Sequence, residues 1–272
     1  MTSPNILTDT AALARNRSRA QADALFLQQA AADEVQDRLD MINRAFTSPA
    51  VVTPFPELWG ARLPEAKILR DNDTLPLEQG AHDLVVHALG LHWANDPVGQ
   101  LIQCRRALAP DGLLMAFALG GQTLHELRSC LGQAEVAVAG GLSPRVAPMG
   151  EVRDLGALLQ RAGLALPVAD TLPLRVEYRS AWALMRDLRA MGEGNAMTAR
   201  SRTPTRRAVF EMAADLYQRH FAAAEGRVVA TFELITLTGW APDASQPKPL
   251  RPGSAQQRLA DALETRETPL SD

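Results

Sequence analysis

The sequence lacks features that would place it in several common classes of protein. It has two cysteines in 272 residues, and Cys104 and Cys130 form neither a CxxC pair nor a metal-ligand spacing. No apolar run is long enough to span a bilayer, and the N-terminus has no signal-peptide apolar core. A formal net charge of −3 gives no reason to expect nucleic-acid binding. We therefore predict a soluble, cytoplasmic protein with reduced cysteines, and peripheral membrane contact stays open.

Short catalytic motifs are also missing. The sequence has no P-loop, no G-x-S-x-G nucleophile elbow and no internal repeat. His87, His92 and His125 match no strong metal-binding pattern, so we predict no metal site. These absences remove several enzyme classes and leave the fold as the main source of information.

The stretch from 81 to 115 predicts a strand, a helix and a second strand. Residues 84–86 form an apolar run typical of a strand buried on both faces. Asp96 is placed as the N-cap of the next helix, with Pro97 at its first position. Pro110-Asp111-Gly112 ends that helix, and a strand resumes at Leu113. This order predicts a right-handed crossover between parallel strands.

The rest of the chain continues the alternation of helices and strands. We expect helices over 8–46 (broken once), 122–138, 151–161, 181–191 and 205–221, and strands over 164–178 and 228–240. The predicted fold class is therefore α/β, with a Rossmann-like sheet. We divide the chain into an N-terminal helical extension (1–46), a main domain (47–241) with a helical cap insertion (181–223), and a Pro-rich tail (242–272).

Several sequence segments carry a resemblance to a known family. The chain resembles class I S-adenosylmethionine-dependent methyltransferases, and more closely the methyltransferase-fold assembly factor of respiratory complex I. It is also similar to the biotin-pathway malonyl-carrier methyltransferase. The resemblance rests on residues 83–85, 91–93, 106–112, 120–128, 140–148, 153–156, 185–192 and 249–255. It covers nearly the whole chain except residues 50–67.

The resemblance implies a set of site residues at the carboxyl edge of the sheet. Asp71 matches the aspartate that accepts a hydrogen bond from the adenine amino group, although a turn aspartate fits the sequence equally well. His92 is the candidate general base. The other candidates are Asn72, His87 and Leu89 for the cofactor, and Trp93, Gln122 and Arg145 for the substrate.

The uncovered segment lacks the usual cofactor loop. A methyltransferase of this class has a glycine-rich loop after its first strand, whereas this chain has Pro54 and Pro56 there, which remove two backbone donors. Only about fifteen residues separate Val51 from the next predicted strand at 67–69, too few for the usual units of about thirty residues. We expect that one strand and its helix are lost or reduced to a turn, which puts S-adenosylmethionine binding in doubt.

Two groups of arginines leave alternatives open. Arg15, Arg17 and Arg19 lie near the start of a helix that could act as a lid over the cofactor cleft. A second group follows residues 192–195, which we expect to be exposed; it comprises Arg200, Arg202, Arg206 and Arg207. Each group fits either a solvated face or a contact with an acidic partner.

The sequence does not decide which activity the chain has, or whether it is an enzyme. By resemblance it is a methyltransferase-like protein of the complex I assembly type, with a degenerate cofactor site. The alternative is a non-catalytic assembly factor or scaffold that binds a complex I subunit or another protein client. A third reading, hydroxylation of a client arginine, would need an oxidant that the sequence does not obviously supply.

Overall fold

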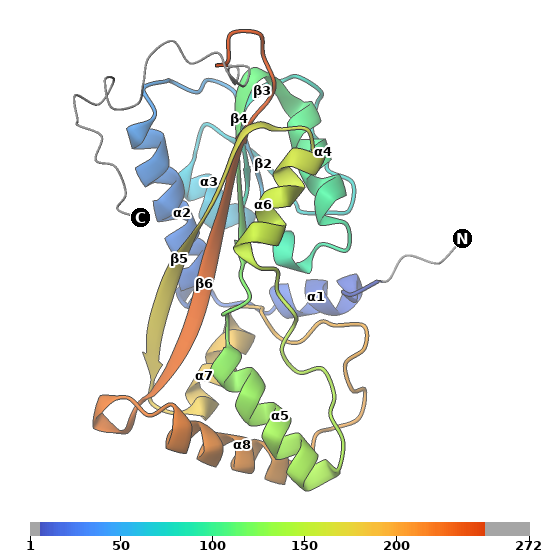
Figure 1. Cartoon of the computed structure of the whole chain (residues 1–272), viewed down its shortest axis with the longest axis vertical. Helices are drawn as coiled ribbons and strands as arrows, with labels where there is room; N and C mark the ends of the chain where they lie inside the picture. The colour runs from blue at the N-terminus through green and yellow to red at the C-terminus, as the bar shows by residue number, and fades with distance from the viewer. Residues whose placement is uncertain (1–5, 248–272) are drawn as a thin grey trace, which may run out of the picture. The chain divides into compact units, whose positions relative to one another are not determined.

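The computed structural model describes residues 6–247, which contain one six-stranded mixed sheet flanked by helices (Figure 1). The strand order is β2-β1-β3-β4-β6-β5. The strands are β1 (Pro49–Val52), β2 (Lys67–Leu69), β3 (His82–His87), β4 (Leu108–Leu119), β5 (Ala165–Tyr178) and β6 (Val228–Trp240). The helices are α1 (Thr10–Arg17), α2 (Phe26–Met41), α3 (Pro56–Arg62), α4 (Pro97–Ala107), α5 (His125–Ala139), α6 (Val152–Arg161), α7 (Ala181–Ala190) and α8 (Arg207–His220).

The chain separates into two compact units, Met1–Pro242 and Asp243–Asp272, and all of these elements lie in the first. Most of the proline-rich tail expected over residues 242–272 lies outside the described residues. Among residues 6–247, no helix has the length and apolar character needed to cross a bilayer.

The helix starts follow the local sequence. The Asp96 carboxylate accepts a hydrogen bond from the Gly99 backbone N–H at 2.7 Å, and Pro97 opens α4, as predicted. The Ser180 hydroxyl caps α7 in the same way, accepting from the Ala183 N–H at 3.2 Å. Each cap satisfies a backbone donor that has no partner inside the helix. Residues 110–112, predicted to be only a turn, lie within β4, where Asp111 has a positive φ of 57°.

The sheet is covered on both faces. Alternate residues of each strand point to opposite sides, so Val51 and Val86 join one core while Val52 and Val85 join the other. The first core packs against α2, α3, α5, α7 and α8, and the second packs against α4 and α6. The structure confirms the Rossmann-like α/β class.

The first half of the sheet is short, in agreement with the predicted loss of one strand–helix unit. β1 pairs directly and in parallel with β2, and Val51 lies opposite Ile68. The only helix between the two strands is the seven-residue α3. β3 and β4 are parallel as predicted, whereas β6 is antiparallel to both of its neighbours.

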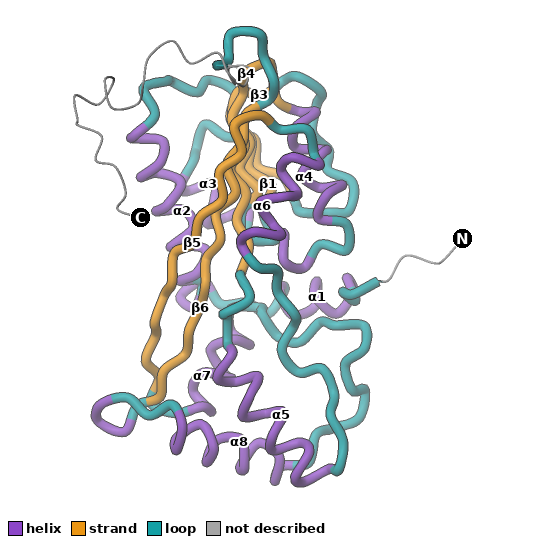
Figure 2. Tube along the Cα trace, in the orientation of Figure 1, coloured by secondary structure: helices purple, strands orange, loops and turns teal. Residues whose placement is uncertain are grey.

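The predicted insertion before the last strand is present as α7 and α8, and α5 packs against α8 (Figures 1 and 2). α5 begins at His125 rather than at Gln122, because residues 121–124 form a turn in which Leu124 has a φ of 55°. The long antiparallel pair of strands β5 and β6 runs down to this group of helices (Figure 2). Together they wall the region beyond the carboxyl end of β4.

Candidate functional site

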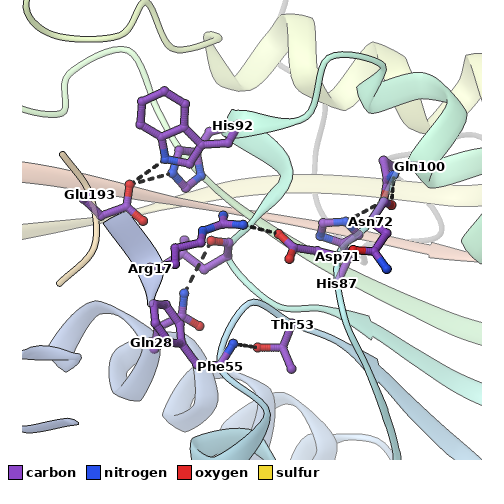
Figure 3. Close-up of polar contacts among 12 residues, drawn as sticks. Arg17, Gln28, Thr53, Phe55, Asp71, Asn72, His87, His92, Gln100 and Glu193 are labelled. Carbon is purple, nitrogen blue, oxygen red and sulfur yellow. Dashed lines mark hydrogen bonds and ion pairs between the residues drawn. The ribbon is translucent and has the colours of Figure 1, made fainter. Parts of the chain in front are cut away.

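Asp71, the candidate adenine-binding residue, is bonded to another side chain of the chain. It lies just after β2, and its Oδ2 is 2.8 Å from Nη1 of Arg17, the last residue of α1 (Figure 3). The side chains of Arg17 and Asp71 are only 11% and 14% exposed. The neighbouring Asn72 contributes its backbone carbonyl, which accepts from Gln100 Nε2 at 2.8 Å. The expected adenine acceptor is therefore bonded to the last residue of α1.

His87 is a buried residue of β3. Its Nε2 lies 3.2 Å from Gln100 Oε1, and its Nδ1 has no hydrogen-bond partner among the described residues. Burial lowers the pKa of His87, because a charged imidazole would be poorly solvated there. This histidine is therefore neutral near pH 7 in the folded protein.

The exit of β1 is filled by an aromatic side chain. Trp59 of α3 is 0% exposed, and its indole N–H donates to Gln28 Oε1 at 2.9 Å. Gln28, on α2, in turn donates from Nε2 to the carbonyl oxygen of Leu89 at 3.4 Å (Figure 3). The Thr53 hydroxyl accepts from the Phe55 N–H at 3.0 Å and fixes the turn out of β1. Leu89, another cofactor candidate, thus has its carbonyl engaged by the chain itself.

His92 and Trp93 converge on one carboxylate. Oε2 of Glu193 accepts from Trp93 Nε1 at 2.6 Å and lies 3.3 Å from His92 Nε2. Burial alone would raise the pKa of Glu193, but the His92 contact, the charge of Arg17 and the Trp93 hydrogen bond lower it. Glu193 is therefore ionised at neutral pH. His92, the candidate general base, is held in this network with its side chain 2% exposed.

A cavity of about 550 Å³ lies next to this network. Trp93 and Arg145 both line it, whereas Gln122 does not; the Gln122 N–H instead donates to Glu233 Oε2 at 3.0 Å. Arg145 is bonded to Glu135 Oε1 at 2.5 Å. Burial would raise the pKa of Glu135, but the hydrogen bonds from Arg145 and Ser143 lower it to about 2. Two of the three substrate candidates therefore share one cavity. Among residues 6–247, no three acidic, histidine or cysteine side chains come together as a metal site.

Comparison with known proteins identifies a methyltransferase domain. A methyltransferase domain profile matches residues 51–116. The chain is 37% identical over 199 residues to the mitochondrial arginine-hydroxylase NDUFAF5 of Danio rerio, which covers 73% of this chain and 62% of that protein. It is 36% identical over 193 residues to the malonyl-[acyl-carrier protein] O-methyltransferase of Laribacter hongkongensis, covering 71% of this chain and 62% of that protein. The chain carries a class I methyltransferase domain.

The methyltransferase domain is also similar in fold to a solved structure, the YcgJ protein of Bacillus subtilis. That match has a TM-score of 0.49 and 9% identity, and it covers 76% of this chain and 97% of the other. The chain spans about 62% of the length of the two curated relatives above.

Sequence reasoning missed three residues of the site in this methyltransferase domain. Arg17 was placed in a basic cluster and Glu193 in an exposed segment, yet both side chains are largely buried. Gln28 was not predicted as a site residue, because a single glutamine in a helical stretch matches no motif. The only available signal for Glu193 was its place between two glycines, Gly192 and Gly194, and Gly192 has a φ of +81°.

The second basic group is only partly a free, solvated face. Arg200 and Arg202 both pair with Asp9, at 2.8 and 3.3 Å. The Arg200 hydrogen bond, the Ala12 N–H and the charges of both arginines lower the pKa of Asp9 to about 2. Arg207 pairs with Glu211 one helical turn away. Arg200 and Arg202 attach the segment after α7 to the chain's own N-terminal part, whereas the Arg207–Glu211 pair lies within α8.

Proposed function

We propose that this chain is a methyltransferase-fold assembly factor of the respiratory complex I type that acts without S-adenosylmethionine. The observation that carries the proposal is the Arg17–Asp71 ion pair, which occupies the one cofactor-binding position that the sequence appeared to retain. The assembly role comes from the sequence resemblance, and relatives at 37% identity are named arginine-hydroxylase NDUFAF5. A client subunit would then be the partner, as the sequence resemblance implies.

The cofactor does not fit the residues present at the exit of β1. A class I site presents backbone N–H groups from a glycine-rich turn, and Pro54 and Pro56 supply none. Trp59 is fully buried at the base of the same region. Its indole N–H donates to the Gln28 amide, whose Nε2 donates to Leu89, so both side chains are already engaged within the chain.

The ion pair adds an energetic barrier to cofactor binding. If adenine took the Asp71 carboxylate, Arg17 would stay behind as a largely buried charge without a partner. Breaking a buried pair in this way costs about 3–5 kcal/mol. That cost corresponds to a loss of roughly two to three and a half powers of ten in affinity.

The alternative function is a conventional S-adenosylmethionine-dependent methyltransferase. It is favoured by the domain match over residues 51–116 and by relatives named as malonyl-[acyl-carrier protein] O-methyltransferases. Under that alternative, Asp71 would bind adenine and His92 would act as the base. Both side chains are bonded to other residues of the chain, to Arg17 and Glu193 respectively, which weighs against it.

The experiment that tests the proposal is genetic complementation. Deletion of the gene in its native host is expected to lower the amount of assembled complex I, measured on native gels and by NADH:quinone oxidoreductase activity. Wild type and the paired variant Arg17→Met with Asp71→Leu should both restore assembly, because the apolar pair keeps the packing and no cofactor is required. A deletion without effect on complex I would refute the assembly role. A folded paired variant that fails to restore assembly would show that Asp71 acts beyond its ion pair.

A further inference from the structure

The cavity beside Glu193 has a charge unlike that of the whole chain. It lies among α5, α7, α8 and the segment after α1, and its charged lining residues are Arg19, Arg145, Arg186, Arg189 and Glu193. Four cations and one anion thus surround one cavity in a protein whose formal net charge is −3. This concentration of positive charge favours an anionic ligand.

One of the four cations is already paired inside the protein, Arg145 with Glu135. The single anion, Glu193, accepts a hydrogen bond from Trp93 and lies 3.3 Å from His92. Within the described part of the chain, Arg19, Arg186 and Arg189 form no ion pair. Three guanidinium groups therefore remain available to a bound anion.

Polarity changes sharply from the mouth of the cavity to its floor. Every exposed lining residue is polar, namely Arg19, Gln21, Arg186 and Arg189. Every buried lining residue is apolar in character, and the floor includes Leu127, Leu131 and Phe232, which belong to the main core. A ligand that matches this gradient has a charged head at the mouth and an apolar body inside.

We propose that this cavity binds an anionic amphiphile, a molecule with one apolar chain and a carboxylate or phosphate head. The head lies among Arg19, Arg186 and Arg189, and the chain lies on the floor beside Phe232. A volume of about 550 Å³ falls within the range of small-molecule sites, which is about 300–1,000 Å³. A bare anion would leave the apolar floor empty, and an apolar molecule without charge would leave the three arginines unused. This inference is independent of the proposed assembly role.

The test is titration of the full-length chain with dodecanoate and dodecyl phosphate below their micelle concentrations. Binding is followed by calorimetry and by indole fluorescence, since Trp93 lines the cavity. We expect saturable binding of both anions, and at least tenfold weaker binding of dodecyltrimethylammonium and of acetate. Equal binding of the cationic amphiphile or of acetate would overturn the proposal, as would absence of dodecanoate binding.

Two variants locate the site. Arg186→Glu with Arg189→Glu should weaken dodecanoate binding at least tenfold. The matched control, Arg153→Glu with Arg161→Glu on α6, carries the same change in net charge on the opposite face of the sheet and should bind normally. An equal loss of dodecanoate binding in both variants would show that net charge, rather than the cavity, determines binding, and would contradict the proposal.

A vesicle experiment distinguishes a membrane lipid from a free acid or phosphate as the natural ligand. Co-sedimentation with phosphatidylglycerol vesicles but not with phosphatidylcholine vesicles, abolished by the Arg186/Arg189 charge reversal, would assign the site to a membrane lipid. Binding of monomeric amphiphile without co-sedimentation would assign it to a free acid or phosphate. Binding of an acidic peptide in place of dodecanoate would show that the cavity binds a protein client, and would overturn the proposal.

Discussion

Replacement of Trp59 by alanine tests the most unusual part of the fold, the filled exit of β1. Trp59 is fully buried, and its indole N–H satisfies Gln28 Oε1 at 2.9 Å. Truncation of a buried tryptophan costs about 3–5 kcal/mol through lost contacts and the cavity left behind. The unsatisfied Gln28 oxygen adds about 1–3 kcal/mol unless a water molecule enters. Because domains are stable by only about 5–15 kcal/mol, Trp59→Ala should be marginally folded.

Urea unfolding followed by circular dichroism measures this loss. With a slope of about 2–3 kcal/mol per molar urea, the unfolding midpoint should fall by at least about 1 M. Trp182→Ala is the matched control, because Trp182 is 39% exposed and should cost about 1 kcal/mol or less. The unfolding midpoint of Trp59→Phe should lie between those of the two alanine variants, since phenylalanine keeps most of the side-chain volume and loses the hydrogen bond. If Trp59→Ala unfolds at the same urea concentration as Trp182→Ala, the filled β1 exit is refuted.

Two further predictions concern pH and helix capping. Because burial lowers the pKa of His87 from its ordinary value of 6.5, the unfolded chain binds more protons below that pH, and stability should fall there by up to about 1.4 kcal/mol per pH unit. His87→Gln should flatten this dependence between pH 7.5 and 5.5 in thermal unfolding, and an unchanged slope would exclude His87 as its source. Ser180→Ala should cost about 1 kcal/mol by removing the cap of α7, while Ser180→Asp should retain stability; equal urea midpoints for wild type and both variants would contradict the capping role.

The fold was largely predictable because its signals are local. Asp96-Pro97 and Ser180 start helices where they were expected, and the last strand occupies 228–240 as predicted. The shortened first half followed from counting residues between 51 and 67, since chain length limits how many elements can fit. The errors at residues 110–112 and 122–124 have different causes. Residues 110–112 lie within β4, where Asp111 donates to the Ala241 carbonyl at 3.2 Å and Gly112 accepts from the Ala241 N–H at 2.8 Å, a pairing with a residue far along the chain. At Leu124 a non-glycine residue adopts a positive φ, which the local sequence does not predict.

The site was much less predictable because its contacts join residues far apart in the sequence. Arg17 and Asp71 are 54 residues apart, and Trp93 and Glu193 are 100 apart. The sequence pointed to Asp71, His92 and Trp93 but could not show which partners satisfy them. Arg17 could be read only as part of a basic cluster, because its burial depends on how α1 packs on the rest of the chain.

The central claim is that the chain's own side chains close the cofactor cleft, and calorimetric titration with S-adenosylmethionine and S-adenosylhomocysteine tests it most directly. The account predicts no heat of binding at millimolar ligand for the wild-type chain, because Arg17 holds Asp71 and Trp59 fills the exit of β1. Micromolar binding that is lost in a folded Asp71→Asn variant would contradict the account. It would restore the reading of this chain as a cofactor-dependent methyltransferase.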